Sequence, residues 1–151
     1  MRRADAAVKA GSNPLDLLTN RGFWPIVLRI ARRLHTAQRK VDLMGARNAR
    51  ISVAKLSEIP LGGVLTVTVA GQPPISIFHT DEGLFAIDDD CPHQKASLAD
   101  GWVENCAVEC PLHESCFDLR TGAVSGPPAK TPVRVHRTGV DSEAVWLEIS
   151  S

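Results

Sequence analysis

The stretch "CPHQKASLADGWVENCAVECPLH", residues 91–113, carries two cysteine–histidine pairs. One residue separates Cys91 from His93, two residues separate Cys110 from His113, and sixteen residues lie between the pairs. Each pair opens with Cys-Pro, and strand-like patterns flank both, so we expect the pairs at the tips of two loops. In a reducing compartment, cysteine interleaved with histidine indicates a metal site more often than a disulfide framework.

Three interpretations of these four residues compete. They could be ordinary buried side chains, although their common position on loop tips argues against this. A structural zinc site usually pairs like with like, in C-x₂₋₄-C and H-x₃₋₅-H spacings, whereas each loop here offers one cysteine and one histidine. The remaining interpretation, which we favour, is a [2Fe–2S] cluster with two thiolates on one iron and two imidazoles on the other.

The segments "CPHQKASLADG" and "CPLHESCFDLRTG" resemble the signature of Rieske iron–sulfur proteins. The resemblance runs from about Arg50 to the C-terminus. It is strongest to the small Rieske ferredoxins of bacterial ring-hydroxylating dioxygenase systems, and the Rieske small subunit of nitrite reductase is also similar. The resemblance implies that Cys91 and Cys110 bind one iron through sulfur, and that His93 and His113 bind the other through a ring nitrogen.

The same resemblance suggests which residues tune the cluster. "SGPPAKTP", residues 125–132, is similar to the proline-rich loop that covers the cluster in this family. Ser115 stands where high-potential Rieske proteins have a serine that donates to a bridging sulfide. Those proteins have a tyrosine two residues further on, where this chain has Phe117. We therefore expect a potential toward the low end of the Rieske range of about −150 to +300 mV.

The remaining cysteines and histidines, and a run of three aspartates, are expected to have structural roles or to lie in solvent. Cys106 and Cys116 are expected to be small buried residues on neighbouring strands, with a redox-active disulfide between them as the alternative. The aspartates of residues 88–90 are expected in a solvated loop, with steering of a basic redox partner as the alternative. The remaining histidines are expected to be structural or on the surface: His35, His79 and His136.

From Arg50 onward the apolar residues recur with a period of two, which indicates β-strands. "VLTVTVA" (64–70), with its threonines outward, "ISIFHT" (75–80) and "LFAID" (84–88) predict an antiparallel meander. "VRVHR" and "AVWLEI" predict two closing strands. We therefore expect residues 50–151 to form an all-β domain, a Rieske-type antiparallel β-sandwich or barrel. Two loops would form its cluster-binding subdomain.

Residues 1–49 are expected to form a separate basic, α-helical extension with a linker. Residues 12–44 show helical patterning, and residues 1–50 hold 11 Lys and Arg against 3 Asp and Glu, a net +8, whereas residues 51–151 carry a net −8. Four roles of the extension stay open. They are packing onto the acidic β domain, docking to a partner subunit, a coiled-coil homo-oligomer, and peripheral contact with an anionic membrane.

A cluster held at loop tips with exposed imidazoles is suited to electron transfer. By the resemblance, the chain shuttles single electrons from a flavin-dependent ferredoxin reductase to a terminal ring-hydroxylating oxygenase, and is not itself an enzyme. Two alternatives are a nitrite reductase small subunit and a tethering or redox-sensing module that acts through the N-terminal helix. No nucleic-acid partner or transmembrane segment is expected. The basic N-terminus is not followed by an apolar signal region, so we expect the cytoplasm.

Overall fold

The computed structural model describes residues 36–41 and 50–150. Most of the predicted helix of residues 12–44 therefore lies outside the described part. Where the two overlap the prediction is wrong, because Thr36–Val41 form strand β1. The six residues pair along their whole length with a strand of the β domain, and this tertiary pairing overrides the helical periodicity.

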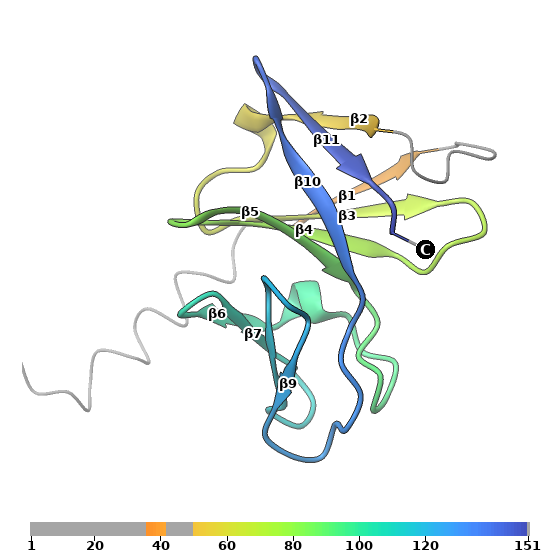
Figure 1. The fold of residues 1–151 in the computed structure, drawn as a ribbon, viewed down its shortest axis with the longest axis vertical. Coiled ribbons are helices and arrows are strands. Elements are labelled where there is room, and N and C mark those ends of the chain that lie inside the picture. Colours follow the sequence, from red (N-terminus) through yellow and green to blue (C-terminus); the bar gives the residue numbers. More distant parts are fainter. Residues whose placement is uncertain (1–35, 42–49, 151) are drawn as a thin grey trace, which may run out of the picture.

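Seven strands form the main sheet, in the order β1-β3-β4-β5-β10-β11-β2 (Figure 1). Beyond β1 they are β2 (Arg50–Lys55), β3 (Val64–Val69), β4 (Ile75–Thr80), β5 (Gly83–Asp88), β10 (Val135–Asp141) and β11 (Ala144–Glu148). All neighbouring strands are antiparallel except β1 and β3, which are parallel. The sheet curls like a barrel, and the predicted meander of β3, β4 and β5 is confirmed.

A second, four-stranded sheet carries the second predicted ligand loop, between β7 and β8, and the first loop leads into it from β5. It consists of β6 (Trp102–Glu104), β7 (Ala107–Glu109), β8 (Cys116–Asp118) and β9 (Val124–Ser125). Together with the short 3₁₀ helix η3 (Leu98–Asp100) it forms a subdomain below the main sheet in Figure 1. The other short helix, η2 (Leu56–Glu58), follows β2. Among the described residues no helix is long and apolar enough to cross a membrane.

The domain has two apolar cores, and β3 contributes to both. Leu65, Val67 and Val69 belong to the core of the main sheet. Val64 belongs to the second core, which includes Phe78, Phe117 and two of the predicted ligands, Cys91 and Cys110. The subdomain therefore covers the second face of β3, and the two predicted cysteine ligands are part of the core between them.

The covered second face explains one error in the predicted pattern. Thr68 is exposed as expected, but Thr66 is 7% exposed and faces inward. Its hydroxyl lies 2.9 Å from the Ser76 hydroxyl, which in turn donates to the Asp89 carboxylate at 2.7 Å. A buried hydroxyl is tolerated when it is hydrogen-bonded, so this polar chain allows a threonine where alternation alone predicted an outward position.

Candidate metal centre

The first ligand loop begins just after β5 and is closed by its own backbone. Asp90 and Ser97 form an isolated antiparallel bridge, and the Cys91 N–H donates to the Ala96 carbonyl at 2.9 Å. The Leu98 N–H donates to the Asp89 carbonyl at 2.8 Å. These bonds bring the chain back on itself within a few residues, and so fix both ends of the loop that carries His93.

The second ligand loop connects β7 to β8 and is closed in the same way. The Cys110 N–H donates to the Ser115 carbonyl at 2.8 Å, and the Glu114 N–H donates to the Cys110 carbonyl at 3.1 Å. Glu114 has φ of 62°, in the left-handed region, which turns the chain back toward β8. Cys110 and His113 therefore lie on one tight turn.

The four predicted ligands form two pairs of like kind. Cys91 and Cys110 are 3% and 1% exposed, and both belong to the second core. Burial raises the pKa of the Cys91 thiol, and the adjacent Cys110 thiol raises it further. His93 and His113 are exposed, with ring centroids 4.7 Å apart and ring planes at 83°. The sulfurs thus lie together inside the molecule, and the imidazoles lie together at its surface.

This arrangement agrees with the comparisons. A family model described as the Rieske [2Fe-2S] domain matches residues 49–137. The chain belongs to the Rieske [2Fe-2S] domain family. The resemblance predicted from the two loop segments is therefore confirmed, and the cofactor of this domain is a [2Fe–2S] cluster rather than zinc.

Several proteins that are similar to this chain are named as ferredoxin subunits of dioxygenase systems. The 3-phenylpropionate/cinnamic acid dioxygenase ferredoxin subunit of Photorhabdus laumondii is 37% identical over 68% of this chain and 96% of its own length. The anthranilate 1,2-dioxygenase ferredoxin subunit of Burkholderia cepacia is 45% identical over 51% of this chain and 78% of its own. A solved complex of reduced oxygenase and oxidized ferredoxin in carbazole 1,9a-dioxygenase contains a chain that matches with a TM-score of 0.63. The matching chain of that complex is 25% identical to the present protein, and the match covers 68% of the present chain and 94% of the chain in the complex.

The residues present suit the Rieske cluster chemically. A two-iron centre with mixed ligation needs two sulfur and two nitrogen donors, sorted so that each kind meets one iron. The structure places the two cysteines together in the core and the two histidines together at the surface. Burial raises the pKa of Cys91 and disfavours a free thiolate there, so the thiolate of this residue would form together with metal binding.

The proline-rich loop is tied to the second ligand loop. Ser115 is 1% exposed, and its hydroxyl oxygen accepts a hydrogen bond from the Ala129 N–H at 3.1 Å. Ala129 is 7% exposed and belongs to the same core as the two ligand cysteines. Ser115 therefore joins the loop that carries His113 to residues 125–132. The predicted effect of this loop and of Ser115 on the potential stays a prediction.

The prediction of a solvated loop at residues 88–90 is wrong. Asp89 is 4% exposed, and one of its carboxylate oxygens accepts from the Ser76 hydroxyl and, at 2.9 Å, from the Ala99 N–H. It thereby joins β4 and η3 at the start of the first ligand loop. Sequence reasoning missed this role, although Ser76 was a visible signal, since it is a polar residue within the apolar "ISIFHT" strand.

Asp88 is also engaged inside the fold. The Ser150 N–H donates to His136 Nδ1 at 3.1 Å, so Nε2 carries the hydrogen and donates to Asp88 at 2.9 Å. Arg134 donates to the same carboxylate oxygen at 3.2 Å. Burial opposes ionisation of Asp88, but the bonds from His136 and Arg134 outweigh it and hold its pKa below the usual value of 3.8.

The remaining histidines are structural where they are described. His136 has a fully buried side chain, and His79 Nδ1 lies 2.6 Å from the Ile59 carbonyl oxygen. Both agree with the prediction, whereas His35 lies outside the described residues.

The two extra cysteines do not form a disulfide in the structure, in which all four cysteines are described. Cys106 is buried but lies in the turn between β6 and β7 and not on a strand as predicted. It and Asn105 both have positive φ, as a two-residue type I′ hairpin turn requires. Cys116 is half-buried on β8, and its sulfur lies 3.6 Å from the Glu114 carbonyl oxygen.

An ion pair links the subdomain to the main sheet. Arg120, just after β8, pairs with Glu82 in the turn between β4 and β5, and with Asp118 at 3.3 Å. The pair is partly exposed and therefore adds little stability by itself. It helps to fix the orientation of the ligand loops relative to the main sheet.

Proposed function

We propose that this chain is the one-electron carrier of a bacterial ring-hydroxylating dioxygenase system. The observation that carries the proposal is the sorting of the four donors within a Rieske domain. Two adjacent cysteines are buried in the core, and two adjacent histidines are exposed. An electron carrier needs its redox centre near the surface yet held rigidly, and this arrangement supplies both conditions.

We assign Cys91, Cys110, His93 and His113 as the four ligands of the cluster. The cluster, once bound, accepts and returns a single electron. The cysteines would anchor it to the second core, while the histidines would leave their outer ring atoms at the surface that a partner contacts. Imidazoles in place of two thiolates raise the potential relative to all-cysteine clusters.

The ligand assignment can be tested by substitution with matched controls. We expect Cys91→Ser, Cys110→Ser, His93→Ala and His113→Ala each to abolish the Rieske EPR signal of the dithionite-reduced protein. Cys106→Ser and His79→Ala should keep it. Retention of the signal in any of the four ligand variants would contradict the assignment of that residue.

The carrier function can be tested by a redox titration of the intact protein. We expect uptake of one electron per chain, with a midpoint inside the Rieske range of about −150 to +300 mV. A midpoint potential of about −400 mV, as in plant-type ferredoxins, would show that the histidines do not bind iron.

The partners follow from the relatives. The ferredoxin subunits of two dioxygenase systems are similar over most of their length, and a similar ferredoxin is seen in complex with an oxygenase. We therefore propose a terminal oxygenase as electron acceptor, a flavin-dependent reductase as donor, and a cytoplasmic location.

The acceptor is tested by mixing reduced protein anaerobically with the oxygenase component of the Burkholderia cepacia anthranilate 1,2-dioxygenase. A parallel mixture contains the large subunit of a nitrite reductase. Faster reoxidation by the oxygenase supports the proposal, and faster reoxidation by the nitrite reductase supports the alternative.

A further inference from the structure

Strand β1 is an addition to the part of the chain that the family model matches. The match begins at residue 49, whereas β1 spans Thr36–Val41. The strand nevertheless pairs with β3 in continuous parallel register, from Thr36 opposite Val64 to Val41 opposite Val69. The segment before the Rieske domain therefore contributes a strand to the domain's own sheet.

Without β1, the strand β3 would be an open edge of the sheet. Its other neighbour is β4, and its six residues are mostly apolar. A long apolar edge strand presents unpaired N–H and C=O groups that readily pair with other chains, so proteins usually cover or shorten such edges. β1 covers this one with its backbone.

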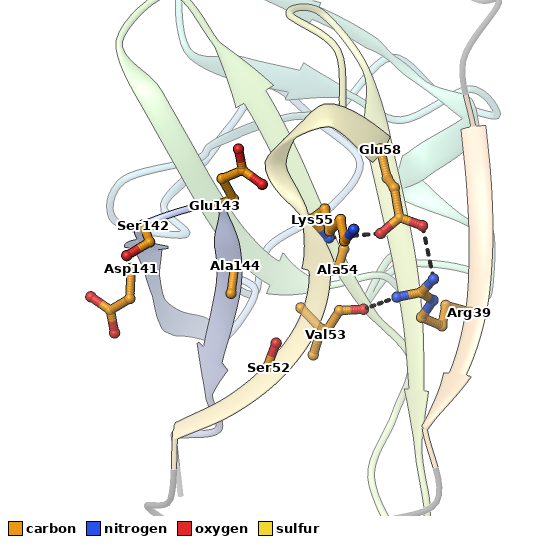
Figure 2. Close-up of a pocket in the computed structure, with 10 residues that line it drawn as sticks. All are labelled: Arg39, Ser52, Val53, Ala54, Lys55, Glu58, Asp141, Ser142, Glu143 and Ala144. Carbon is orange, nitrogen blue, oxygen red and sulfur yellow. Dashed lines mark hydrogen bonds and ion pairs between the residues drawn. The ribbon is translucent and has the colours of Figure 1, made fainter.

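One side chain of β1 makes specific contacts beyond the backbone. Arg39 Nη1 donates to the Val53 carbonyl at 2.7 Å, and Nη2 donates to Glu58 Oε1 at 2.8 Å (Figure 2). Glu58 is held ready for this contact, because its other oxygen accepts from the Lys55 N–H at 2.6 Å. Val53 lies on β2, the strand at the opposite end of the sheet order, so Arg39 bridges the seam of the barrel.

The rest of β1 is held by its backbone pairing with β3. The side chains of residues 37–40 are all exposed, and Arg39 lines an open groove of about 670 Å³ together with β2 and the turn between β10 and β11. Recognition by a backbone ladder plus one specific side chain is the mode by which proteins bind an extended peptide at a sheet edge.

We propose that the β3 edge and the β2–η2 segment, Val53–Glu58, form a strand-binding site for an extended segment with arginine as its fourth residue. Residues Thr36–Val41 of the same chain occupy this site. In doing so they close the sheet edge, and Thr36 lies opposite Val64, which belongs to the same core as the ligand cysteines.

A disulfide cross-link in the full-length, cluster-loaded protein tests the register and the occupant. Lys40 and Thr68 lie directly opposite each other, and both are exposed. We expect Lys40→Cys with Thr68→Cys to form a disulfide within one chain under mild oxidation. The control Gln38→Cys with Thr68→Cys is two residues out of register, beyond the reach of a disulfide of about 7 Å between Cα atoms, and should not.

Hydrogen exchange of the full-length protein tests the role of Arg39. We expect Arg39→Ala to speed exchange of the β3 amides roughly fivefold, mainly because it loses the partly buried hydrogen bond to the Val53 carbonyl, while Lys40→Ala leaves the rate unchanged. The exposed ion pair with Glu58 adds little to this effect. An unchanged visible spectrum shows that the domain has folded in each variant. Equal exchange in Arg39→Ala and Lys40→Ala would overturn the proposal.

The cross-linking experiment can also overturn it. Failure of Lys40→Cys with Thr68→Cys to form a disulfide would do so. Disulfide-linked dimers would show that the β1 of a second copy occupies the site, which contradicts the proposed occupant.

Discussion

Substitution of Ser115 by alanine tests whether the second ligand loop depends on the proline-rich loop. The change removes the acceptor of the Ala129 N–H but leaves the Ser115 backbone carbonyl, which holds Cys110. Because the amide is buried, it is left without a partner, at a cost of about 1–3 kcal/mol. In a domain of this size that lowers the thermal midpoint by at least about 4 °C.

The loss should be visible in two measurements. Unfolding in guanidinium chloride, followed by far-ultraviolet circular dichroism, should shift its midpoint to lower denaturant without a change of slope. Bleaching of the visible cluster absorbance should occur earlier in the same titration. Ser125→Ala is the control, since Ser125 is exposed on β9. Equal midpoints for Ser115→Ala and the control would refute the structural role of the hydroxyl.

Three further predictions follow from the packing and charges. Phe117→Ala, at a fully buried site in the same core as the ligand cysteines, should cost about 3–5 kcal/mol in urea unfolding and speed cluster loss. Gly122→Ala should lower the thermal midpoint, because a Cβ there would lie 2.0 Å from the Val133 carbonyl oxygen and φ is +74°. The pKa of Asp88 is lowered in the fold, so its ionised form stabilises the protein above an unfolded pKa of about 3.9, and this contribution is lost as pH falls through the folded pKa. The difference in unfolding free energy between wild type and Asp88→Asn should therefore shrink below about pH 4, and a constant difference down to pH 2 would contradict this.

The family and the two loops that carry the predicted ligands could be predicted from the sequence, because this information is local. The spacing within each Cys–His pair fits a single closed loop, and a loop needs no distant partner to bring its own residues together. The flanking alternation then predicted most strands, and the structure has them within a few residues of the expected limits. Strands β6 and β9 were missed, because three and two residues are too few to show a period. Strands β7 and β8 are as short as β6, but they flank the second Cys–His pair, where strand-like patterns were expected.

The errors at residues 36–41, Thr66 and Asp89 involve contacts between segments that are separated in the chain. The helical periodicity around residues 36–41 was overridden by pairing with β3, some thirty residues later. Thr66 and Asp89 were predicted to face solvent, but the subdomain covers them and Ser76 joins their side chains. A polar side chain is buried only where it finds a hydrogen-bond partner, and the pattern of a single sequence does not show which residue that partner is.

The supports of the two ligand loops indicate how the site is kept rigid. Asp89 ties the start of the first loop to β4 and η3, Ser115 ties the second loop to Ala129, and each loop is also closed by its own backbone. These bonds involve no predicted ligand side chain. The buried cysteines are therefore positioned by the core, and the exposed histidines by the loop backbone. These supports would keep the four predicted ligands in place during electron transfer, which is the property that a carrier between two partners requires.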